Sequence, residues 1–364
     1  MSFESGSITF RMFYLPQALP SDYVERFAGK ALPPISTLGT DPIRGWVTGR
    51  HQLDSCITPE TAHIAGFLRM TLVQVERKVF ESLLRAECRI EELARLKAEG
   101  RSEIDRRTRS EIRKEILDRL QATAQPQIKG LSIVHAPGSG LLFAEAVSDN
   151  QMDALEAAFR ETMGFGLIPA NPTAEAFRQK IDARGILPTS YSPDCDDDSA
   201  GENIGHDFLT WLWFVSESQG GLINLNDSQF AMMISGPLKF VCEGQGAHET
   251  MLRRGLPEVS AEAKIALLGG KKLSRAKFTL ARGNETWETT VDADQFIFRG
   301  LKLPEGEKLD PVSRFQERMA ALDVFQQAFL RSFAIFLHQR VSPEQWKPVQ
   351  SSIHEWVANR AGRK

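Results

Sequence analysis

The side chains most able to do chemistry are basic, and they gather between Arg253 and Arg282. This stretch contains only two acidic residues, Glu258 and Glu262, although the whole chain has a formal net charge of -3. Clustered cations favour phosphates because each one releases counterions condensed on a nucleic acid. The stretch therefore predicts a polyanion-binding face. The alternative is that these basic residues only form the solvated faces of a helix and a hairpin. Its basic members are Arg253, Arg254, Lys264, Lys271, Lys272, Arg275, Lys277 and Arg282.

Two groups of carboxylates are candidates for a magnesium site. A nuclease needs acidic residues close together, because the metal polarises the phosphate and activates water. Asp292 with Asp294, or Asp196 to Asp198, could supply them. Neither group lies in a recognisable nuclease motif, and residues 292–294 are more simply a turn between strands. A magnesium-dependent exonuclease remains an alternative.

Other catalytic and metal-binding motifs are not found in the sequence. The alternation of Asp194, Asp196 and Asp198 is similar to a calcium loop, but Ser199 and Gly205 occupy the places of its Gly and its bidentate Glu. Gly269-Gly-Lys-Lys lacks the spacing and the hydroxyl of an ATP-binding loop. We therefore expect no catalytic residue, no metal and no cofactor.

The composition is ordinary for a soluble globular protein. Apolar content is 42% and charged content 25% of 364 residues. The most apolar windows, 208–215 and 325–337, are shorter than the roughly 20 residues of a membrane span. The N-terminus lacks the features of a secretory signal, and the four cysteines form no C-x-x-C pair. We expect a cytoplasmic protein that does not interact with membranes.

Strand and helix patterns alternate through the first half. Residues 76–120 have apolar residues at helical spacing and nearly balanced charges, which predicts two long helices divided at Gly100-Arg101-Ser102, their charges mostly solvated. The interleaving predicts an α+β fold with mixed or antiparallel sheets. Strands are expected at 7–15, 45–47, 65–75, 130–134, 141–147 and 167–169, and other helices from Ser21 and at 149–162.

The second half begins with an irregular, acidic and glycine-rich segment at 188–206. Trp211 and Trp213 follow in an apolar run that is typical of a core, although they could also stack on unpaired bases. The apolar stripe of the last long helix, 311–339, is expected in the core, with self-association as the alternative. Strands are expected at 221–225, 230–234, 238–242, 273–281 and 287–291, and a helix at 260–268.

This order of elements resembles the recombination-associated protein RdgC family. The resemblance covers most of residues 8–170 and 250–340, and it is dispersed, without a sharp catalytic signature. It is carried by Phe10-Arg-Met-Phe-Tyr14, Gly45-Trp-Val47, the helices at 79–92 and 112–120, Gly140-Leu-Leu-Phe-Ala-Glu-Ala146, Leu252-Arg-Arg254, Val259-Ser-Ala-Glu-Ala-Lys264, Gly269-Gly-Lys-Lys-Leu-Ser-Arg-Ala-Lys-Phe-Thr-Leu280 and Phe298-Arg-Gly-Leu-Lys-Leu-Pro304.

The resemblance implies a ring-shaped homodimer with a positively charged hole that duplex DNA passes through without sequence readout. The implied role is non-enzymatic: the nucleoid-associated protein occupies DNA and limits access of the RecA recombinase. Single-stranded DNA remains a possible ligand, and a protein-interaction scaffold without DNA binding is the second alternative. We expect phosphate contacts from Arg253, Arg254, Lys271, Lys272, Arg275 and Lys277, with Arg69 and Lys129 as further candidates.

Two segments depart from the family. Gln121 to Gln127 stand where the family has Pro, a basic residue and Phe at the closing contact of the dimer, which puts that contact in question. Residues 188–245 look like an insertion or a divergent segment. The expected division is therefore an N-terminal α+β region at 1–187, the insertion at 188–245, and a C-terminal α+β region at 246–364 with the basic stretch and the terminal helices.

Overall fold

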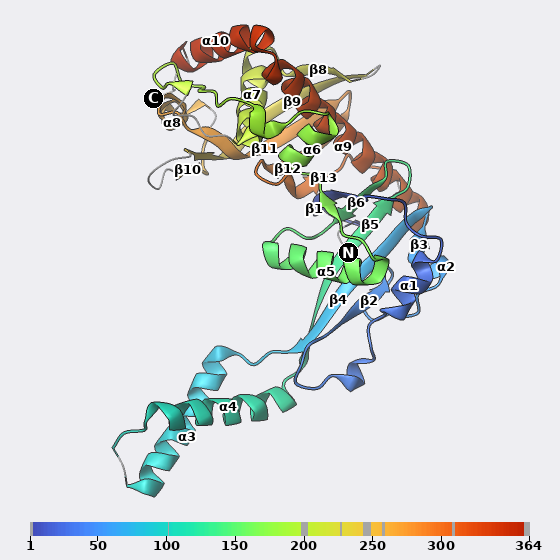
Figure 1. Ribbon diagram of the computed structural model, residues 1–364, viewed down its shortest axis with the longest axis vertical. Coiled ribbons are helices and arrows are strands. Elements are labelled where there is room, and N and C mark those ends of the chain that lie inside the picture. Colours follow the sequence, from blue (N-terminus) through green and yellow to red (C-terminus); the bar gives the residue numbers. More distant parts are fainter. Residues whose placement is uncertain are drawn as a thin grey trace.

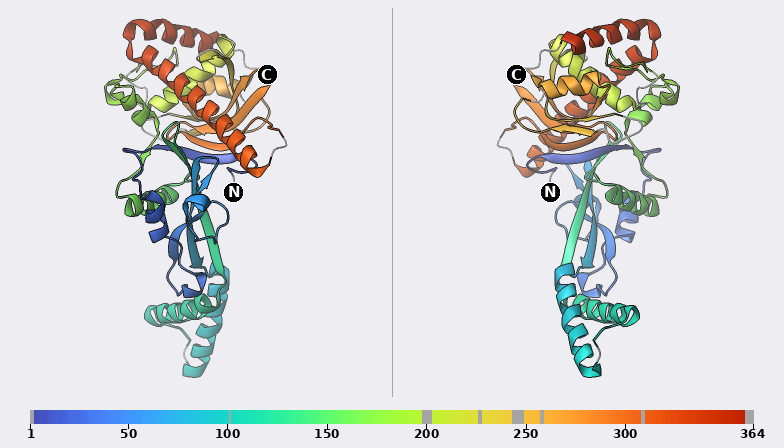
Figure 2. Two further views of the ribbon diagram at one scale, coloured as in Figure 1. Left: turned by 90° about the vertical axis from the view of Figure 1, so that its right-hand side faces the viewer. Right: turned by 90° about the vertical axis from the view of Figure 1, so that its left-hand side faces the viewer.

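The computed structural model describes residues 3–100, 102–197, 203–225, 228–242, 249–256, 259–307 and 310–359. The molecule is C-shaped and has three parts along its long axis (Figure 1). A C-terminal lobe lies at one end, an N-terminal lobe lies in the middle, and a helical hairpin projects at the other end. Figure 2 shows from both sides that the hairpin extends beyond the sheets. The large antiparallel sheet flanked by helices confirms the predicted α+β class.

The N-terminal lobe is an antiparallel sheet in the order β1-β6-β5-β4-β2. Its helix α5, Asp149–Met163, begins with a capping box between Ser148 and Gln151 and ends at Gly164 with φ +83°. The apolar side of α5 packs with Phe27 and Trp46. The other elements are β1 Ile8–Tyr14, α1 Tyr23–Gly29, a 3-10 turn Ile35–Thr37, β2 Ile43–Thr48, α2 Pro59–Ala62, β3 His63–Ile64, β4 Phe67–Arg77, β5 Pro126–Ala136, β6 Leu141–Ala144 and β7 Ile168–Pro169.

The hairpin consists of α3, Glu81–Glu99, and α4, Arg106–Thr123. Gly100 ends α3 in the left-handed conformation, with φ +65°, and Asp105 caps α4 by accepting the Thr108 N–H at 2.9 Å. A small apolar seam joins the two helices, and its buried members are Leu84 of α3 with Ile112 and Ile116 of α4. The predicted pair of long charged helices, divided at Gly100, is thus present, and ion pairs between the helices supplement the seam.

The C-terminal lobe is a second antiparallel sheet, in the order β10-β9-β11-β12-β13-β1, with helices packed on one face. Its elements are α6 Pro172–Arg178, a 3-10 turn Ala183–Gly185, α7 Ile204–Ser218, β8 Leu222–Leu225, β9 Ser228–Val241, β10 Glu249–Leu252, α8 Ala261–Leu268, β11 Lys272–Arg282, β12 Glu285–Asp292, β13 Ile297–Lys302, α9 Pro311–Val341 and α10 Pro343–Asn359. The β11–β12 hairpin and α8 lie where the sequence predicted them.

The described residues of 188–245 form an integral part of this lobe, and their interpretation as an insertion or a divergent segment stays a prediction. The aromatic run is α7, and residues 204–215 are all buried. Strand β9 pairs with β11 from Ala231↔Ala281 to Val241↔Lys272. Strand β9 thus joins β10 and β11 in the sheet, and α7 contributes a large part of the core.

The core of the C-terminal lobe is dense in aromatic rings. Phe329 of α9 lies at its centre and contacts the rings of Phe208, Phe278, Phe296, Phe298 and Phe325, with centroid distances from 4.8 to 6.3 Å. By length and composition alone, α9 would pass as a membrane span, as core helices also do. Its apolar stripe packs against α7 and the sheet, which confirms the prediction of a core helix.

Replacing Phe329 by Ala is expected to lower the free energy of unfolding by about 3–5 kcal/mol, because the change opens a cavity among five rings. Urea denaturation followed by tryptophan fluorescence measures the change. Phe177→Ala is the matched control, since that ring is 79% exposed and its removal is expected to cost less than about 0.5 kcal/mol. Equal midpoints for the two variants would contradict this description of the core.

Candidate nucleic-acid interface

The two faces of the C-terminal sheet differ in chemistry. Phe278, Trp287 and Phe298 point toward α9, with Trp287 Nε1 donating to Ala321 O at 2.9 Å. Side chains alternate along each strand, so their neighbours point the other way. We call that other side the polar face. Its members are Lys239 of β9, Arg275 and Lys277 of β11, Glu288, Thr290 and Asp292 of β12, and Arg299 of β13. Strand pairing places them in two rows across the sheet, Lys239↔Arg275↔Asp292 and Lys277↔Thr290↔Arg299.

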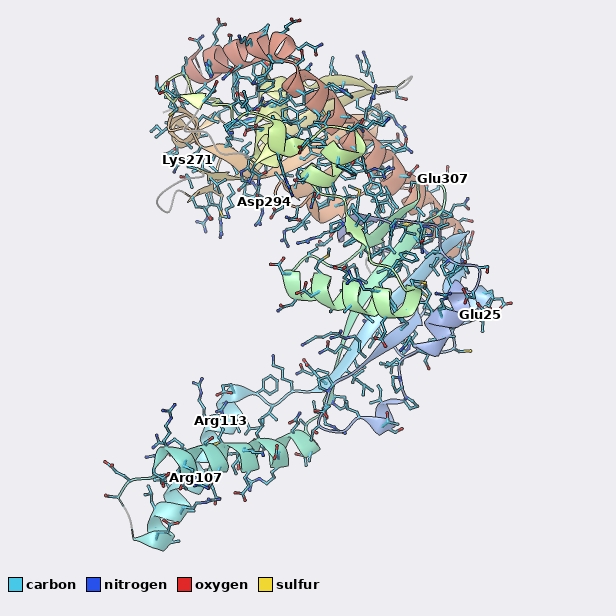
Figure 3. All side chains as sticks on the ribbon, viewed as in Figure 1. Glu25, Arg107, Arg113, Lys271, Asp294 and Glu307 are labelled. Atoms are coloured by element: carbon cyan, nitrogen blue, oxygen red, sulfur yellow. The ribbon has the colours of Figure 1, made fainter. Side chains whose placement is uncertain are left out.

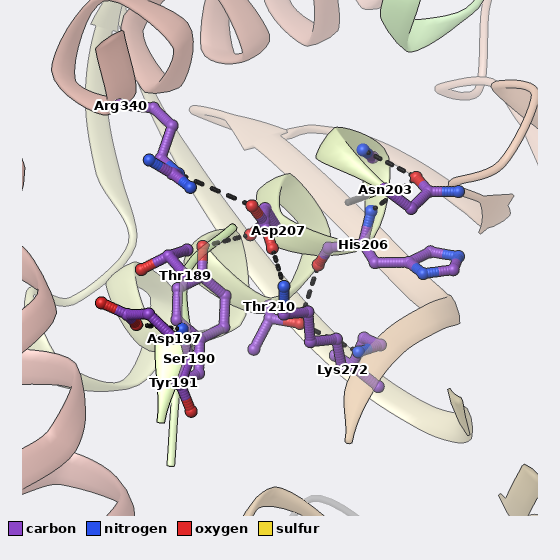
Figure 4. A network of polar contacts seen from close by, with 12 residues as sticks. Thr189, Ser190, Tyr191, Asp197, Asn203, His206, Asp207, Thr210, Lys272 and Arg340 are labelled. Carbon is purple, nitrogen blue, oxygen red and sulfur yellow. Dashed lines mark hydrogen bonds and ion pairs between the residues drawn. The ribbon is translucent and has the colours of Figure 1, made fainter. Parts of the chain in front are cut away.

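Lys272 belongs to the interior and not to a DNA-binding surface. Its Nζ lies 2.5 Å from Asp207 Oδ1 of α7, and the two side chains are 5% and 4% exposed. Arg340 of α9 approaches the same carboxylate, with Nε 3.5 Å from Oδ2 (Figure 4). The prediction that Lys272 contacts phosphate is therefore wrong in this fold. A cation beside a buried carboxylate forms a structural ion pair that a phosphate cannot reach.

This buried network connects distant parts of the lobe. The Tyr191 hydroxyl donates to Asp207 O at 2.8 Å, and Leu273 N donates to the Thr210 hydroxyl at 2.9 Å (Figure 4). Arg340 also donates to Leu187 O. Segment 187–191, α7, β11 and α9 are thus held together through one carboxylate and its neighbours.

Arg69 and Lys129 lie in the N-terminal lobe and away from the polar face. Arg69 is only 5% exposed; it pairs with Glu4, and its guanidinium lies 5.5 Å from the centroid of the Phe315 ring. Arg69 is therefore a packing residue, and its prediction as a phosphate contact is also wrong. Lys129 is exposed at the surface of β5 and pairs with Glu76 of β4.

Arg275 and Lys277 lie on the polar face, where each has a carboxylate partner. Arg275 Nη2 is 2.5 Å from Asp292 Oδ2, and Lys277 pairs with Glu288, which Lys302 also approaches at 3.5 Å. Both cations are about one-third exposed. Such partly exposed pairs contribute little to stability, so a phosphate can compete with the carboxylates for them.

Arg253, Arg254 and Lys271 are the most available members of the basic stretch. Arg253 and Arg254 are exposed after β10, and neither forms an ion pair among the described residues. Lys271 Nζ donates to the Thr250 hydroxyl at 2.7 Å. The acidic Glu258 of this stretch lies outside the described residues. Of the six main candidates, five are thus at or near the surface of the C-terminal lobe.

The structure adds two cations that the sequence analysis missed, Lys239 and Arg299. With Arg253 and Arg275 they line a hollow of about 420 Å³, whose other lining residues are Pro237, Leu238, Met251 and Thr290. Both side chains follow the alternation of polar and apolar residues along their strands, β9 and β13. This alternation is the feature of the sequence from which their position on the polar face could have been predicted. They were overlooked because they lie outside the dense basic stretch.

The described carboxylates of the nuclease candidates have hydrogen-bond or ion-pair partners in the fold. Asp292 contacts Arg275, and Asp294 Oδ1 lies 2.5 Å from His206 Nε2. The hydrogen bond from His206 is the main cause that holds the pKa of Asp294 below its usual value, with Lys239 and Arg275 adding to it. Within the described ranges, no group of three or more His, Cys, Asp or Glu side chains is placed to hold a metal. Asp198 and Ser199 of the possible calcium loop lie outside the described residues.

Trp211 and Trp213 are core residues, as the favoured interpretation predicted. Their side chains are almost fully buried. Trp213 Nε1 donates to Glu217 at 2.7 Å, and Trp211 packs on Phe336. Neither ring can stack on a base.

A second hollow, of about 430 Å³, lies between α6, α9 and the ends of β1 and β9. Buried Glu175 and Tyr14 meet there, and burial raises the pKa of each. The Arg178 guanidinium lies 3.7 Å from the centroid of the Tyr14 ring. The hollow combines one acid with several cations and amides, a mixture that selects no single ligand chemistry.

Compared with known proteins, the chain matches no family model and no curated relative.

Lys272→Ala is expected to destabilise the protein by about 3–5 kcal/mol, because it leaves Asp207 buried with an incomplete set of partners. Urea denaturation measures the loss. Lys271→Ala is the matched control. The ammonium group of Lys271, the residue before Lys272, is at the surface and forms no ion pair among the described residues. A stable Lys272→Ala protein would overturn the structural role of this lysine.

Proposed function

We propose that the protein binds DNA through its phosphates, without reading sequence, and by occupying DNA limits the action of a RecA-type recombinase. The main observation is the gathering of cations from three strands, β9, β11 and β13, and from the end of β10 on one side of the C-terminal lobe. Arginine and lysine at a surface bind phosphates by charge and hydrogen bonding, and they contact the backbone that all sequences share. In this proposal the protein is not an enzyme, and it acts in the cytoplasm, on the nucleoid.

The position of these cations within the C-shaped molecule supports the proposal. Figure 3 shows Lys271 and Asp294 on the C-terminal lobe, which is one arm of the C, and Arg107 and Arg113 on the hairpin, which is the other arm. Lys239 and Arg275 are close enough to Asp294 to lower its pKa. The basic residues of the C-terminal lobe and of the hairpin can therefore face one polyanion held within the C.

We also propose that two protomers associate through the hairpin and enclose DNA in a ring. One stripe of α3 carries exposed apolar side chains at helical spacing, which a charged surface helix does not need. Its members are Phe80, just before the helix, with Leu83, Ile90 and Leu93; they are 66%, 47%, 63% and 51% exposed. None of these four side chains belongs to the Leu84 seam that packs on α4.

The segment that departs from the family has a local role in the structure. Residues 121–123 end α4, and Pro126 begins β5, while Gln121 Nε2 donates to Thr40 O at 2.7 Å. These residues anchor the hairpin to the N-terminal lobe. We therefore place the protomer contact on α3.

The double variant Arg254→Gln/Lys271→Gln is expected to weaken binding to all duplexes by a common factor. Because two phosphate contacts are lost, the slope of log affinity against log salt should decrease in magnitude by roughly 2. Fluorescence anisotropy with duplexes of unrelated sequence, at several salt concentrations, measures both effects.

The matched control is Arg184→Gln/Lys347→Gln, which removes two exposed cations on the helical side of the lobe. It is expected to bind as the unmodified protein does. Equal affinities and slopes for the two double variants would contradict the proposed face. Duplex fragments after incubation with Mg²⁺ would show instead that the protein is a nuclease.

Ile90→Glu/Leu93→Glu is expected to convert a dimer to a monomer, because two carboxylates in the apolar stripe cannot be buried against a partner. Light scattering coupled to gel filtration measures the mass. Leu187→Glu, at a side chain 79% exposed on the C-terminal lobe, should remain dimeric. A dimeric hairpin variant would exclude the α3 stripe as the contact.

A further inference from the structure

The hollow on the polar face has cationic walls drawn from four separate segments. Lys239 comes from β9, Arg253 follows β10, Arg275 comes from β11 and Arg299 from β13. The remaining lining is apolar or neutral, and no carboxylate belongs to it. Sheet pairing fixes three of these residues, because Arg275 is in register with Lys239 and Thr290 with Arg299. The arrangement is therefore a feature of the folded sheet and not of one flexible loop.

Carboxylates neutralise part of this charge from outside the hollow. Arg275 contacts Asp292, and Lys239 Nζ lies 2.9 Å from Glu249 Oε2 at the sheet edge. Arg253 donates Nε–H to Met251 Sδ, and Arg299 forms no ion pair among the described residues. Two of the four cations thus have no counter-charge within the part of the chain that the structure describes.

Arg299 has an unused donor, and it lies beside a further guanidinium. Its buried Nε has no hydrogen-bond partner, and neither has the buried Nε of Arg11 on β1. Burial lowers the pKa of Arg11; Asp149 and Asp292 oppose this effect, and Arg299 adds to it. The positive charges of Arg11 and Arg299 repel each other, and Arg299 lines the hollow. An anion bound in the hollow would offset this repulsion, and its oxygens would be acceptors for the cations that line it.

We propose that this hollow is a discrete binding site for one phosphate group. A phosphate carries enough charge and acceptor oxygens to engage several cations at once, and the planar guanidinium groups can bind it through paired N–H donors. The phosphate can belong to the DNA backbone or to a free phosphate compound. Only the first source rests on the proposed function.

Isothermal titration of the full chain with inorganic phosphate and with pyrophosphate, in chloride buffer, tests the site without DNA. The variants Arg299→Gln and Arg253→Gln should each lower the affinity by about tenfold or more, as expected for the loss of a charged hydrogen bond. Arg184→Gln, on the helical side, should leave it unchanged. Arg253 is exposed, so its variant keeps the test valid if Arg299→Gln fails to fold.

The same proteins are then titrated with a labelled duplex. Phosphate and DNA affinities that fall together in both hollow variants support a backbone phosphate as the ligand. Loss of phosphate binding with unchanged DNA affinity, or without any DNA binding, supports a site for a free phosphate compound. Absence of saturable binding of phosphate and pyrophosphate, or binding that survives both substitutions, overturns the site, whether or not DNA binds elsewhere.

Discussion

The double use of strand β1 is the constraint on which the rest of the structure depends. Its first residues pair with β13, as Ile8↔Leu301 and Phe10↔Phe298, and its last residues pair with β6, from Arg11↔Ala144 to Tyr14↔Leu141. One short strand therefore belongs to both sheets. Backbone hydrogen bonds on the two sides of this strand fix the direction of one lobe relative to the other, and hence the curvature of the C.

The junction also brings charge to where the lobes meet. Arg11, in the middle of β1, is 5% exposed and lies near Asp149 of the N-terminal lobe and Asp292 of the C-terminal lobe. Its neighbour Arg299 is on the adjacent strand. Pairing of β1 with β13 thus brings a desolvated guanidinium near Arg299, which lines the cationic hollow.

The basic stretch is divided by the fold into two physical roles. At the start of β11, Lys272 turns inward to Asp207, while Lys271 remains at the surface next to it. Further along the strand, Arg275 and Lys277 point to the polar face. A buried ammonium group needs a carboxylate partner to offset its desolvation, whereas surface groups remain able to exchange partners. Two neighbouring lysines therefore have different roles: Lys272 stabilises the core, and Lys271 contributes positive charge to the surface.

Local patterns in the sequence were sufficient for most elements. The alternation in 273–281 and 287–291 predicted the β11–β12 hairpin, and the helical spacing of 76–120 with Gly100 predicted the projecting hairpin. These features depend on neighbouring residues, whose periodicity is visible without the fold. The aromatic run of α7 showed its apolar character but not its place, because a segment buried on all sides has no periodic contrast.

What the sequence by itself determined is the class of fold, the types of most but not all elements, and a local excess of cations around 253–282. Tertiary structure alone decided which cations are available, because burial and pairing depend on residues far apart in the chain. Asp207 of α7 withdraws Lys272 into the core, and Glu4 and Phe315 enclose Arg69. Conversely, strand register brings Lys239 and Arg299 to Arg275. The charge of a side chain follows from its residue type, but its exposure to solvent depends on how the whole chain packs.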